Sequence, residues 1–302
     1  MPATFKLYHD GSVQFIDSRV TGAVSFAHVT DLHLPGVPRE GWPSRYRQAI
    51  QWWNVEMRFP DRAMGGLLDE ISEAGVDVVF FGGDVLDYYD AGAAEHVVEL
   101  CRQRGLTPRF QLGNHDYENE YVRFVTHEFD ADVFAENSRR LCEHWRMPGI
   151  EYMFDVGGVR FLSLSIEYIW GLEEGGRGVV SDAQADWLIE QLNHDGPIVI
   201  FHHIPFALPT LTPRLQQIWD GKLACISEDD NGRRIREAVA HNSNVLGVFV
   251  GHAHLRSEDP LGQTWQFMNG PAHLGEWRYV KISAEEPPKS LNIAGVPAVG
   301  QQ

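Results

Sequence analysis

The sequence contains little cysteine and no long apolar run. Its three cysteines, Cys101, Cys142 and Cys225, are far apart among 302 residues and odd in number, which fits a reducing compartment better than a disulfide framework. No apolar run approaches the roughly 18 to 20 residues that a membrane-spanning helix needs. The first residues also lack the basic and apolar sections of a signal peptide. We therefore expect a cytoplasmic protein that does not enter a membrane.

Runs of basic residues are also missing. The chain has 25 Lys and Arg against 42 Asp and Glu, which gives a net charge of −17 with neutral histidine. Proteins that bind the phosphate backbone of nucleic acids usually cluster Lys and Arg, so a nucleic-acid partner is disfavoured. An anionic substrate would be repelled at long range and would need a local positive charge, such as a metal ion. Composition leaves the oligomeric state open.

Apolar residues make up 43% of the chain, enough for a sizeable core. Strand-like and helix-like segments alternate, as in an α/β protein. Pro60 to Gly75 has helical spacing and ends in glycine, and Ser181 to Gln184 forms a capping box before another helix. We predict one domain over residues 1–283, which begins with a hairpin over 1–22 laid on the core. Residues 284–302, rich in Pro, Gly and Ala, would form a tail.

Five short motifs rich in metal-ligand residues occur in order along the chain. They are Asp31-Leu32-His33, Gly83-Asp84-Val85-Leu86-Asp87, Gly113-Asn114-His115-Asp116, His202-His203-Ile204-Pro205 and Gly251-His252-Ala253-His254. Four of them follow apolar runs typical of buried strands, which are Val24 to Val29, Val78 to Phe81, Ile198 to Phe201 and Val245 to Val250. The run before Gly113 is weaker. Because ligand sites collect at the carboxyl ends of strands in open α/β sheets, we expect the motifs to meet in one polynuclear metal site.

The residue types in these motifs suit two divalent ions. Imidazole and carboxylate ligands without thiolate favour Mn, Fe, Zn, Co or Ni over a sulfur-rich structural zinc site. A carboxylate at a strand end can bridge two ions. Two ions about 3.5–4 Å apart can clamp the attacking and leaving oxygens of an in-line displacement at phosphorus.

In this order, the motifs resemble those of the calcineurin-like metallophosphoesterase superfamily. That pattern is D-x-H, G-D-x-x-D, G-N-H-[DE], H-x-P or H-H, and G-H-x-H, and the likeness extends from Asp31 to His254. The resemblance implies two facing mixed β-sheets flanked by helices, a four-layer α/β/β/α sandwich. It also implies hydrolysis of phosphodiester or phosphomonoester bonds of small substrates by a metal-bound hydroxide. The D-x-H start resembles the cyclic-nucleotide and glycerophosphodiester phosphodiesterase branch.

The resemblance further implies which residues hold each metal. The first metal would be held by Asp31, His33 and His254, the second by Asn114, His203 and His252, and Asp84 would bridge both. His115 would lie beside the phosphate without binding metal, where it stabilises charge or protonates the leaving oxygen. Asp116 is expected to orient His115, since a carboxylate that accepts one ring N–H fixes the tautomer.

Two positions require a choice. His202 and His203 are adjacent, and successive strand side chains point to opposite faces, so one of them faces the metals. We predict His203, because His203-Ile204-Pro205 fits the H-x-P form. Purple acid phosphatases place a metal-bound tyrosine at the position of Asp87. This chain does not, so no Fe(III)–tyrosinate colour is expected.

Four longer inserts are candidates for substrate selection, because the metals alone do not distinguish one phosphate ester from another. They are Leu34 to Phe59, Tyr117 to Pro148, Glu167 to Val180 and Phe206 to Asp230. Their aromatic residues either stack on a nucleobase or aryl leaving group, or pack the loops onto the core. His273 follows a predicted strand and is a further candidate for the site.

Two other functions are consistent with the same fold. A non-catalytic scaffold would have lost a ligand or the motif histidine, and none is lost here. A protein Ser/Thr phosphatase usually carries a longer signature after G-N-H-E, whereas this chain reads Gly113-Asn114-His115-Asp116-Tyr117. We therefore favour a small phosphate ester as the substrate.

Overall fold

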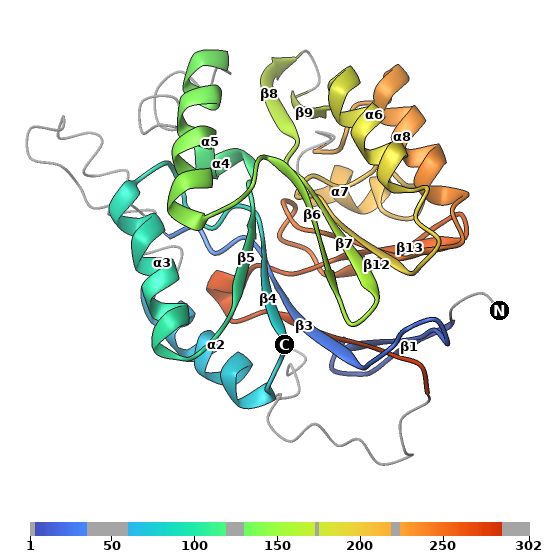
Figure 1. The fold of residues 1–302 in the computed structure, drawn as a ribbon. Helices are drawn as coiled ribbons and strands as arrows, with labels where there is room; N and C mark the ends of the chain where they lie inside the picture. The colour runs from blue at the N-terminus through green and yellow to red at the C-terminus, as the bar shows by residue number, and fades with distance from the viewer. Residues whose placement is uncertain (1–3, 35–59, 119–129, 173–174, 219–223, 286–302) are drawn as a thin grey trace, which may run out of the picture.

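The computed structural model describes residues 4–34, 60–118, 130–172, 175–218 and 224–285. These residues form two six-stranded sheets that face each other, a separate two-stranded hairpin, and helices on both outer sides (Figure 1). The architecture is the four-layer α/β/β/α sandwich that the motifs implied, so the predicted fold class is confirmed.

The first sheet has the strand order β1-β2-β14-β3-β4-β5. Its strands are β1 (Thr4–Leu7), β2 (Val13–Ile16), β14 (Arg278–Ser283), β3 (Val24–Val29), β4 (Val78–Gly82) and β5 (Pro108–Gln111). Strands β3, β4 and β5 are parallel, and β14 runs antiparallel to β3. The hairpin β1–β2 does more than lie on the core, because β2 pairs in parallel with β14 and so extends the sheet.

The second sheet has the order β12-β13-β11-β10-β7-β6. Its strands are β12 (Ser257–Leu261), β13 (Thr264–Met268), β11 (Val245–Val250), β10 (Ile198–Phe201), β7 (Val159–Leu164) and β6 (Glu151–Val156). Strands β13, β11, β10 and β7 are parallel to one another. The separate hairpin consists of β8 (Glu167–Leu172) and β9 (Gly175–Val179).

Helices cover the outer face of each sheet. Those beside the first sheet are α2 (Pro60–Ala74), α3 (Ala91–Gln103) and α5 (Ala131–Trp145), and those beside the second are α6 (Asp182–Gln191) and α8 (Asp230–Ala240) (Figure 1). Among the described residues, three short helices lie in loops, namely α4 (Asn114–Tyr117), α7 (Thr212–Ile218) and η2 (Ala272–Leu274). The predicted capping box is present, since Ser181 Oγ accepts the Gln184 N–H while the Gln184 side chain accepts the Ser181 N–H.

Buried phenylalanines fill the space between the sheets. Phe26 of the first sheet has its ring centroid 5.5 Å from that of Phe201 and 5.2 Å from that of Phe249, both in the second sheet. Phe80 stacks on Phe201 with centroids 3.5 Å apart. All four side chains are fully buried, and each fully buried aromatic side chain contributes about 1.5–3 kcal/mol. This packing fixes the two sheets relative to each other, and with them the strand ends that carry the motifs.

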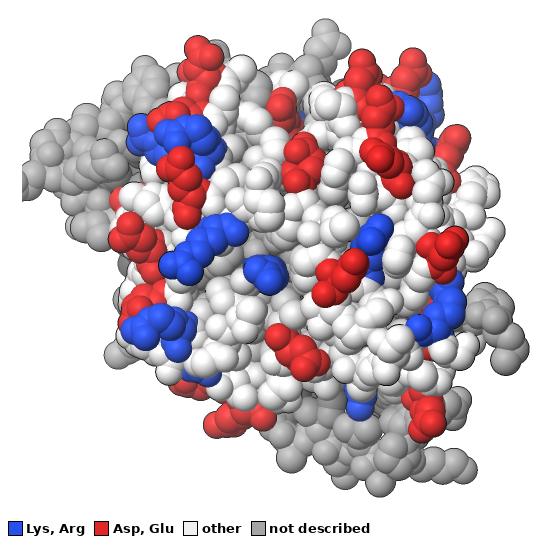
Figure 2. Space-filling view, in the orientation of Figure 1, with Lys and Arg blue, Asp and Glu red and all other residues white. Residues whose placement is uncertain are grey.

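Of the predicted inserts, residues 35–59 and 119–129 lie outside the described part of the chain. The insert from Glu167 to Val180 contains the hairpin β8–β9, and the insert from Phe206 to Asp230 contains α7. Within the described ranges, no helix combines the length and the apolar character that crossing a bilayer requires. On the face of the molecule seen in Figure 2, basic side chains are interspersed with acidic ones.

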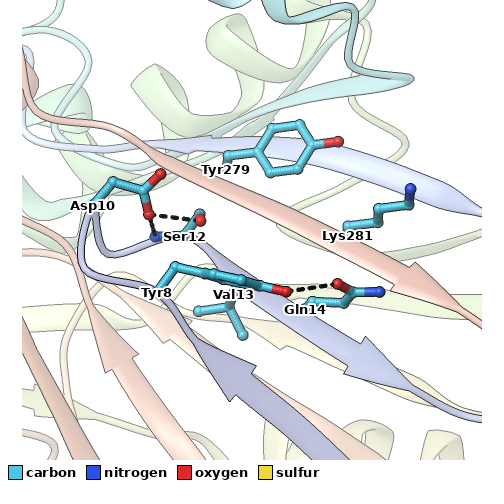
Figure 3. A pocket seen from close by; sticks show the side chains of 7 residues that line it. All are labelled: Tyr8, Asp10, Ser12, Val13, Gln14, Tyr279 and Lys281. Atoms are coloured by element: carbon cyan, nitrogen blue, oxygen red, sulfur yellow. Dashed lines mark hydrogen bonds between the residues drawn. The ribbon is translucent and has the colours of Figure 1, made fainter. Parts of the chain in front are cut away.

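A small pocket with a volume of about 40 Å³ opens on the outer face of the first sheet, over β2 and β14 (Figure 3). It is lined by Tyr8, Asp10, Ser12, Val13, Gln14, Tyr279 and Lys281. Tyr8 donates a hydrogen bond to Gln14, and Asp10 accepts two from Ser12. None of the lining residues belongs to the five motifs.

Candidate metal centre

The five motifs meet at one end of the sandwich. Three of them follow β3, β4 and β5 of the first sheet, and two follow β10 and β11 of the second. The site is therefore shared between both sheets. It lies at the carboxyl ends of parallel strands, as the sequence predicted.

The first predicted ligand set forms a compact group. Asp31, His33 and His254 offer ligand atoms that all lie within 4.8 Å of one another. The two Nε2 atoms of His33 and His254 are 2.9 Å apart, and His254 Nε2 is 3.4 Å from Asp31 Oδ1. The Asp31 carboxylate also accepts the His252 backbone N–H, at 3.0 and 3.1 Å, which ties the first motif to the last.

The second predicted set is brought together in the same way. Asp84, His203 and His252 form another group of potential ligands within the same limit. Asn114 begins α4 and is completely buried. Neither polar atom of its amide has a hydrogen-bond partner among the described residues. A buried amide without a partner is costly, and a cation would satisfy its oxygen.

Asp84 lies between the two sets. Its Oδ2 is 3.0 Å from His203 Nε2 and 3.9 Å from His33 Nε2, so one carboxylate oxygen faces a histidine of each set. Its Oδ1 accepts the His115 backbone N–H at 2.9 Å. A Cβ atom on Gly113 would collide with this carboxylate, which explains the glycine before Asn114.

The histidine pair separates as strand geometry requires. His203 faces Asp84 and Asp31, and its Nδ1 lies 2.8 Å from the Gly82 carbonyl oxygen. The His202 ring turns away, with Nδ1 2.7 Å from the Ile204 carbonyl oxygen. Of the two, only His203 is in a position to bind metal.

We expect His203→Ala to lower occupancy of the second site and to cost far more activity than His202→Ala. The reason is that His203 contributes a ligand atom, whereas His202 contributes packing against Phe206. Metal analysis and rate measurements on both purified variants check this, with circular dichroism to show that each is folded. The reverse order of losses would mean that the wrong face of the strand has been assigned.

Most of the predicted ligands have an unusual backbone conformation. Six described residues other than glycine have left-handed φ angles, and five of them are Asp31 (57°), His33 (51°), Asp84 (49°), His252 (71°) and His254 (52°). A left-handed conformation costs a residue with a Cβ roughly 1–2 kcal/mol. Such strain collects at functional sites, where the surrounding packing maintains it. Here the five strained residues belong to the first, second and fifth motifs, and all five are members of the groups of potential ligands.

Burial and neighbouring charges set the protonation of the histidines. Burial lowers the pKa of His33 to about 4 and that of His252 to about 3, so both imidazoles are neutral near pH 7. Neutral imidazole is the form that binds metal. Burial would raise the pKa of Asp84, but the imidazolium charges of His203 and His115 lower it well below its ordinary value. Burial would lower the pKa of His203, but the Asp84 carboxylate raises it to about 9, so this histidine carries a proton that a bound cation would have to displace. The donor set is thus one of carboxylates, an amide oxygen and imidazoles, which fits two divalent cations of the predicted kinds.

The contacts of Asp116 differ from those that the sequence suggested. Its two carboxylate oxygens accept backbone N–H groups, from Leu86 at 2.7 Å and from Gly113 at 2.8 Å. The carboxylate beside the His115 ring is instead Asp87, whose Oδ1 is 3.4 Å from His115 Nδ1. We therefore assign the orienting role to Asp87, and to Asp116 the role of joining the second and third motif loops.

Asp87 is the site residue that the sequence reading undervalued. Its Oδ1 also lies 3.4 Å from His33 Nδ1, so a single oxygen faces both the first ligand set and His115. His33, Asp87 and His115 form a third group of potential ligands. The sequence did contain a signal for this role, because Asp87 is the second aspartate of the G-D-x-x-D motif.

Two residues outside the five motifs also reach the site. His273 lies on η2, with its ring centroid 5.4 Å from that of His254 and 6.0 Å from that of His33. Tyr168 of β8 packs its ring 4.8 Å from that of His252. Tyr168 is almost fully buried and its backbone N–H donates to Tyr117, so this insert aromatic packs onto the core.

Comparisons with known structures found similar folds. The chain is similar to a dimetal phosphatase from Danio rerio, with 14% identity and a TM-score of 0.49 over 83% of this chain and 88% of that one. It is similar to the protein TT1561 of Thermus thermophilus, with 9% identity and a TM-score of 0.47 over 83% and 91%. It is also similar to the purple acid phosphatase PPD1 from yellow lupin (Lupinus luteus) seeds, with 14% identity and a TM-score of 0.47 over 88% and 47%. None of the curated proteins that were compared matches the sequence.

The family assignment comes from a different comparison. A model of the family described as calcineurin-like phosphoesterase matches residues 24–256. This range covers most of the chain and contains all five motifs. The protein therefore belongs to the calcineurin-like phosphoesterase family.

Proposed function

We propose that this protein is a phosphoesterase that uses two divalent metal ions to hydrolyse a phosphodiester or phosphomonoester bond of a small substrate. The observation that supports the proposal is that six of the seven predicted ligands, all except Asn114, lie in two compact groups, with the Asp84 carboxylate facing a histidine of each group. When bound, the two ions would supply an acidified water and neutralise charge that develops on the phosphoryl oxygens.

The protein's own groups would divide the remaining work. Asp31, His33 and His254 would hold one ion, and Asn114, His203 and His252 would hold the other. Asp84 would contact both. The sandwich core and the left-handed loop residues keep these atoms in place before any ion arrives, which reduces the reorganisation that binding requires.

His115 is suited to give a proton to the leaving oxygen. Its Nε2 points towards the site, 3.8 Å from Asp84 Oδ2, and its side chain is still slightly exposed. Its Nδ1 faces Asp87, 3.4 Å from Oδ1 and 3.3 Å from the backbone oxygen. Because both of these oxygens are acceptors at pH 7, Nδ1 would carry a proton and the ring would be held with Nε2 towards the substrate. The proton given to the leaving oxygen would be a second one, on Nε2 of the imidazolium form, whose charge the Asp84 and Asp87 carboxylates would stabilise.

Reconstitution of the apo-protein tests the proposed function. Metal-free protein would be reloaded with Mn, Zn, Co or Fe and assayed on a bis-aryl phosphate, an aryl phosphate, cyclic nucleotides and glycerophosphodiesters. We expect no turnover without metal, and turnover of at least one diester or monoester once two equivalents are bound. The Asp84→Asn variant, treated in the same way, controls for phosphatases carried through purification.

The outcome also separates the other functions. Protein that binds two ions yet turns over none of these esters would instead support a non-catalytic scaffold. Turnover of a phosphoserine peptide at the expense of all small esters would support a protein phosphatase. Either result would contradict the proposal.

A further inference from the structure

The short helix η2 holds the loop that begins the metal centre. Its Ala272 N–H donates to the Thr30 carbonyl at 2.8 Å. His273 Nδ1 lies 2.9 Å from the Asp31 carbonyl oxygen, and the His273 backbone N–H approaches the same oxygen at 3.5 Å. The carbonyls of Asp31, which begins the first motif, and of Thr30 before it are therefore bound by two consecutive residues of η2.

The chemistry of this contact fixes the state of the His273 ring. A carbonyl oxygen can only accept a hydrogen bond, so Nδ1 must carry the proton. Asp31 is also one of the ligands with a left-handed backbone, at φ 57°. A hydrogen bond to its carbonyl opposes the rotation that would relieve this strain and would turn the carboxylate out of the site.

The helix that presents His273 is itself held in place. It packs against α2 and ends at Gly275, which has a left-handed φ of 85°. Trp277, which follows it, donates from Nε1 to Glu70 of α2 at 3.4 Å. Because η2 is anchored in this way, the hydrogen bond from His273 can restrain the Asp31 carbonyl. His273 is only 7% exposed, whereas the neighbouring Leu274 side chain is 52% exposed.

We propose that His273 is a positioning residue for the first metal: its Nδ1–H holds the strained Asp31 backbone so that the carboxylate stays directed at His33 and His254. The residue lies in the β13–β14 connection, beyond the region 24–256 that matches the family model. The inference rests on the proposed function, because it assumes that Asp31 binds a metal.

Three variants test the role of the donor. His273→Phe keeps an aromatic ring but removes the Nδ1–H, and His273→Asn places an amide N–H close to the position of Nδ1. Leu274→Ala is the matched control on the same helix, since that side chain faces solvent. Stepwise Mn²⁺ titration followed by calorimetry and by electron paramagnetic resonance measures the affinity of each site independently of turnover.

We expect His273→Phe to weaken one Mn²⁺ site by about 10–100-fold, the usual cost of losing a partner that orients a metal ligand, and to leave the other within about threefold. His273→Asn should recover most of this loss, and Leu274→Ala should bind both ions as the wild type does. Equal weakening of both sites by His273→Phe, or no recovery in His273→Asn, would overturn the positioning role. Unchanged Mn²⁺ affinity with slower turnover would also overturn it and would make His273 a substrate contact. Failure of the wild type itself to bind two ions would instead refute the proposed function.

Discussion

Asp84→Asn should weaken both metal sites together. The substitution keeps the size of the side chain and a carbonyl oxygen for the His115 N–H, but it removes the negative charge between the two ligand sets. Loss of outer partners of a metal ligand typically costs 10–100-fold in affinity, so loss of a bridging charge should cost at least about 100-fold at each site. Metal analysis of the purified variant and Mn²⁺ titration measure this effect, and activity should fall with occupancy.

Asp259→Asn provides the matched control for Asp84→Asn. Asp259 is an equally buried carboxylate on β12, where it accepts hydrogen bonds from Thr210 at 2.6 Å and from Ser257 at 2.7 Å. Its neutralisation should lower stability without removing either ion. If Asp84→Asn retained two full equivalents at unchanged affinity, Asp84 would not bridge the metals.

The second large effect is expected for His115→Ala. A general acid matters most when the leaving group is poor, because a good leaving group departs as the anion unaided. The variant should keep two metals, yet lose more rate on an alkyl phosphodiester than on a nitrophenyl diester. The difference between the two losses should approach the roughly 10²–10⁴-fold that is typical of general acid catalysis.

The two substrates act as controls for each other in this experiment. A general loss of folding or of metal would slow both reactions, and metal analysis of the same sample would reveal it. Equal loss on both substrates with two metals present would assign His115 to charge stabilisation or to positioning of the phosphate. Loss of metal would make His115 structural to the site.

Much of the fold could be predicted because its signals are local. The strand over Val24–Val29 and the strand over Val245–Val250 have the bounds expected from their apolar runs. The capping box at Ser181 marks the start of α6 as expected. The motif after each run marks the end of the strand. In the third motif, for example, Gly113 directly precedes the predicted ligand Asn114, because a Cβ atom at residue 113 would collide with Asp84.

The contacts of Asp116 and Asp87 could not be obtained in this way. Adjacency to His115 favoured Asp116, but α4 turns the Asp116 carboxylate towards the backbone N–H groups of Leu86 and Gly113. Asp87 is 28 residues away from His115 and reaches it because β4 and β5 pair side by side. The register between two strands depends on both strands and on their connection, so it cannot be predicted from one short motif.

The sequence by itself indicated an α/β protein through its periodicity, and it carried the five motifs, because both are properties of neighbouring residues. The resemblance of those motifs to a family then implied the four-layer fold and the side chains offered to the metals. The tertiary structure decided which of these side chains face one another. It placed Asp84 between ligands from both sheets and brought His273 Nδ1 of η2 to hydrogen-bonding distance of the Asp31 carbonyl oxygen. These relations depend on how the phenylalanine core and α2 pack distant segments together, and packing between such segments leaves no periodic trace along the chain.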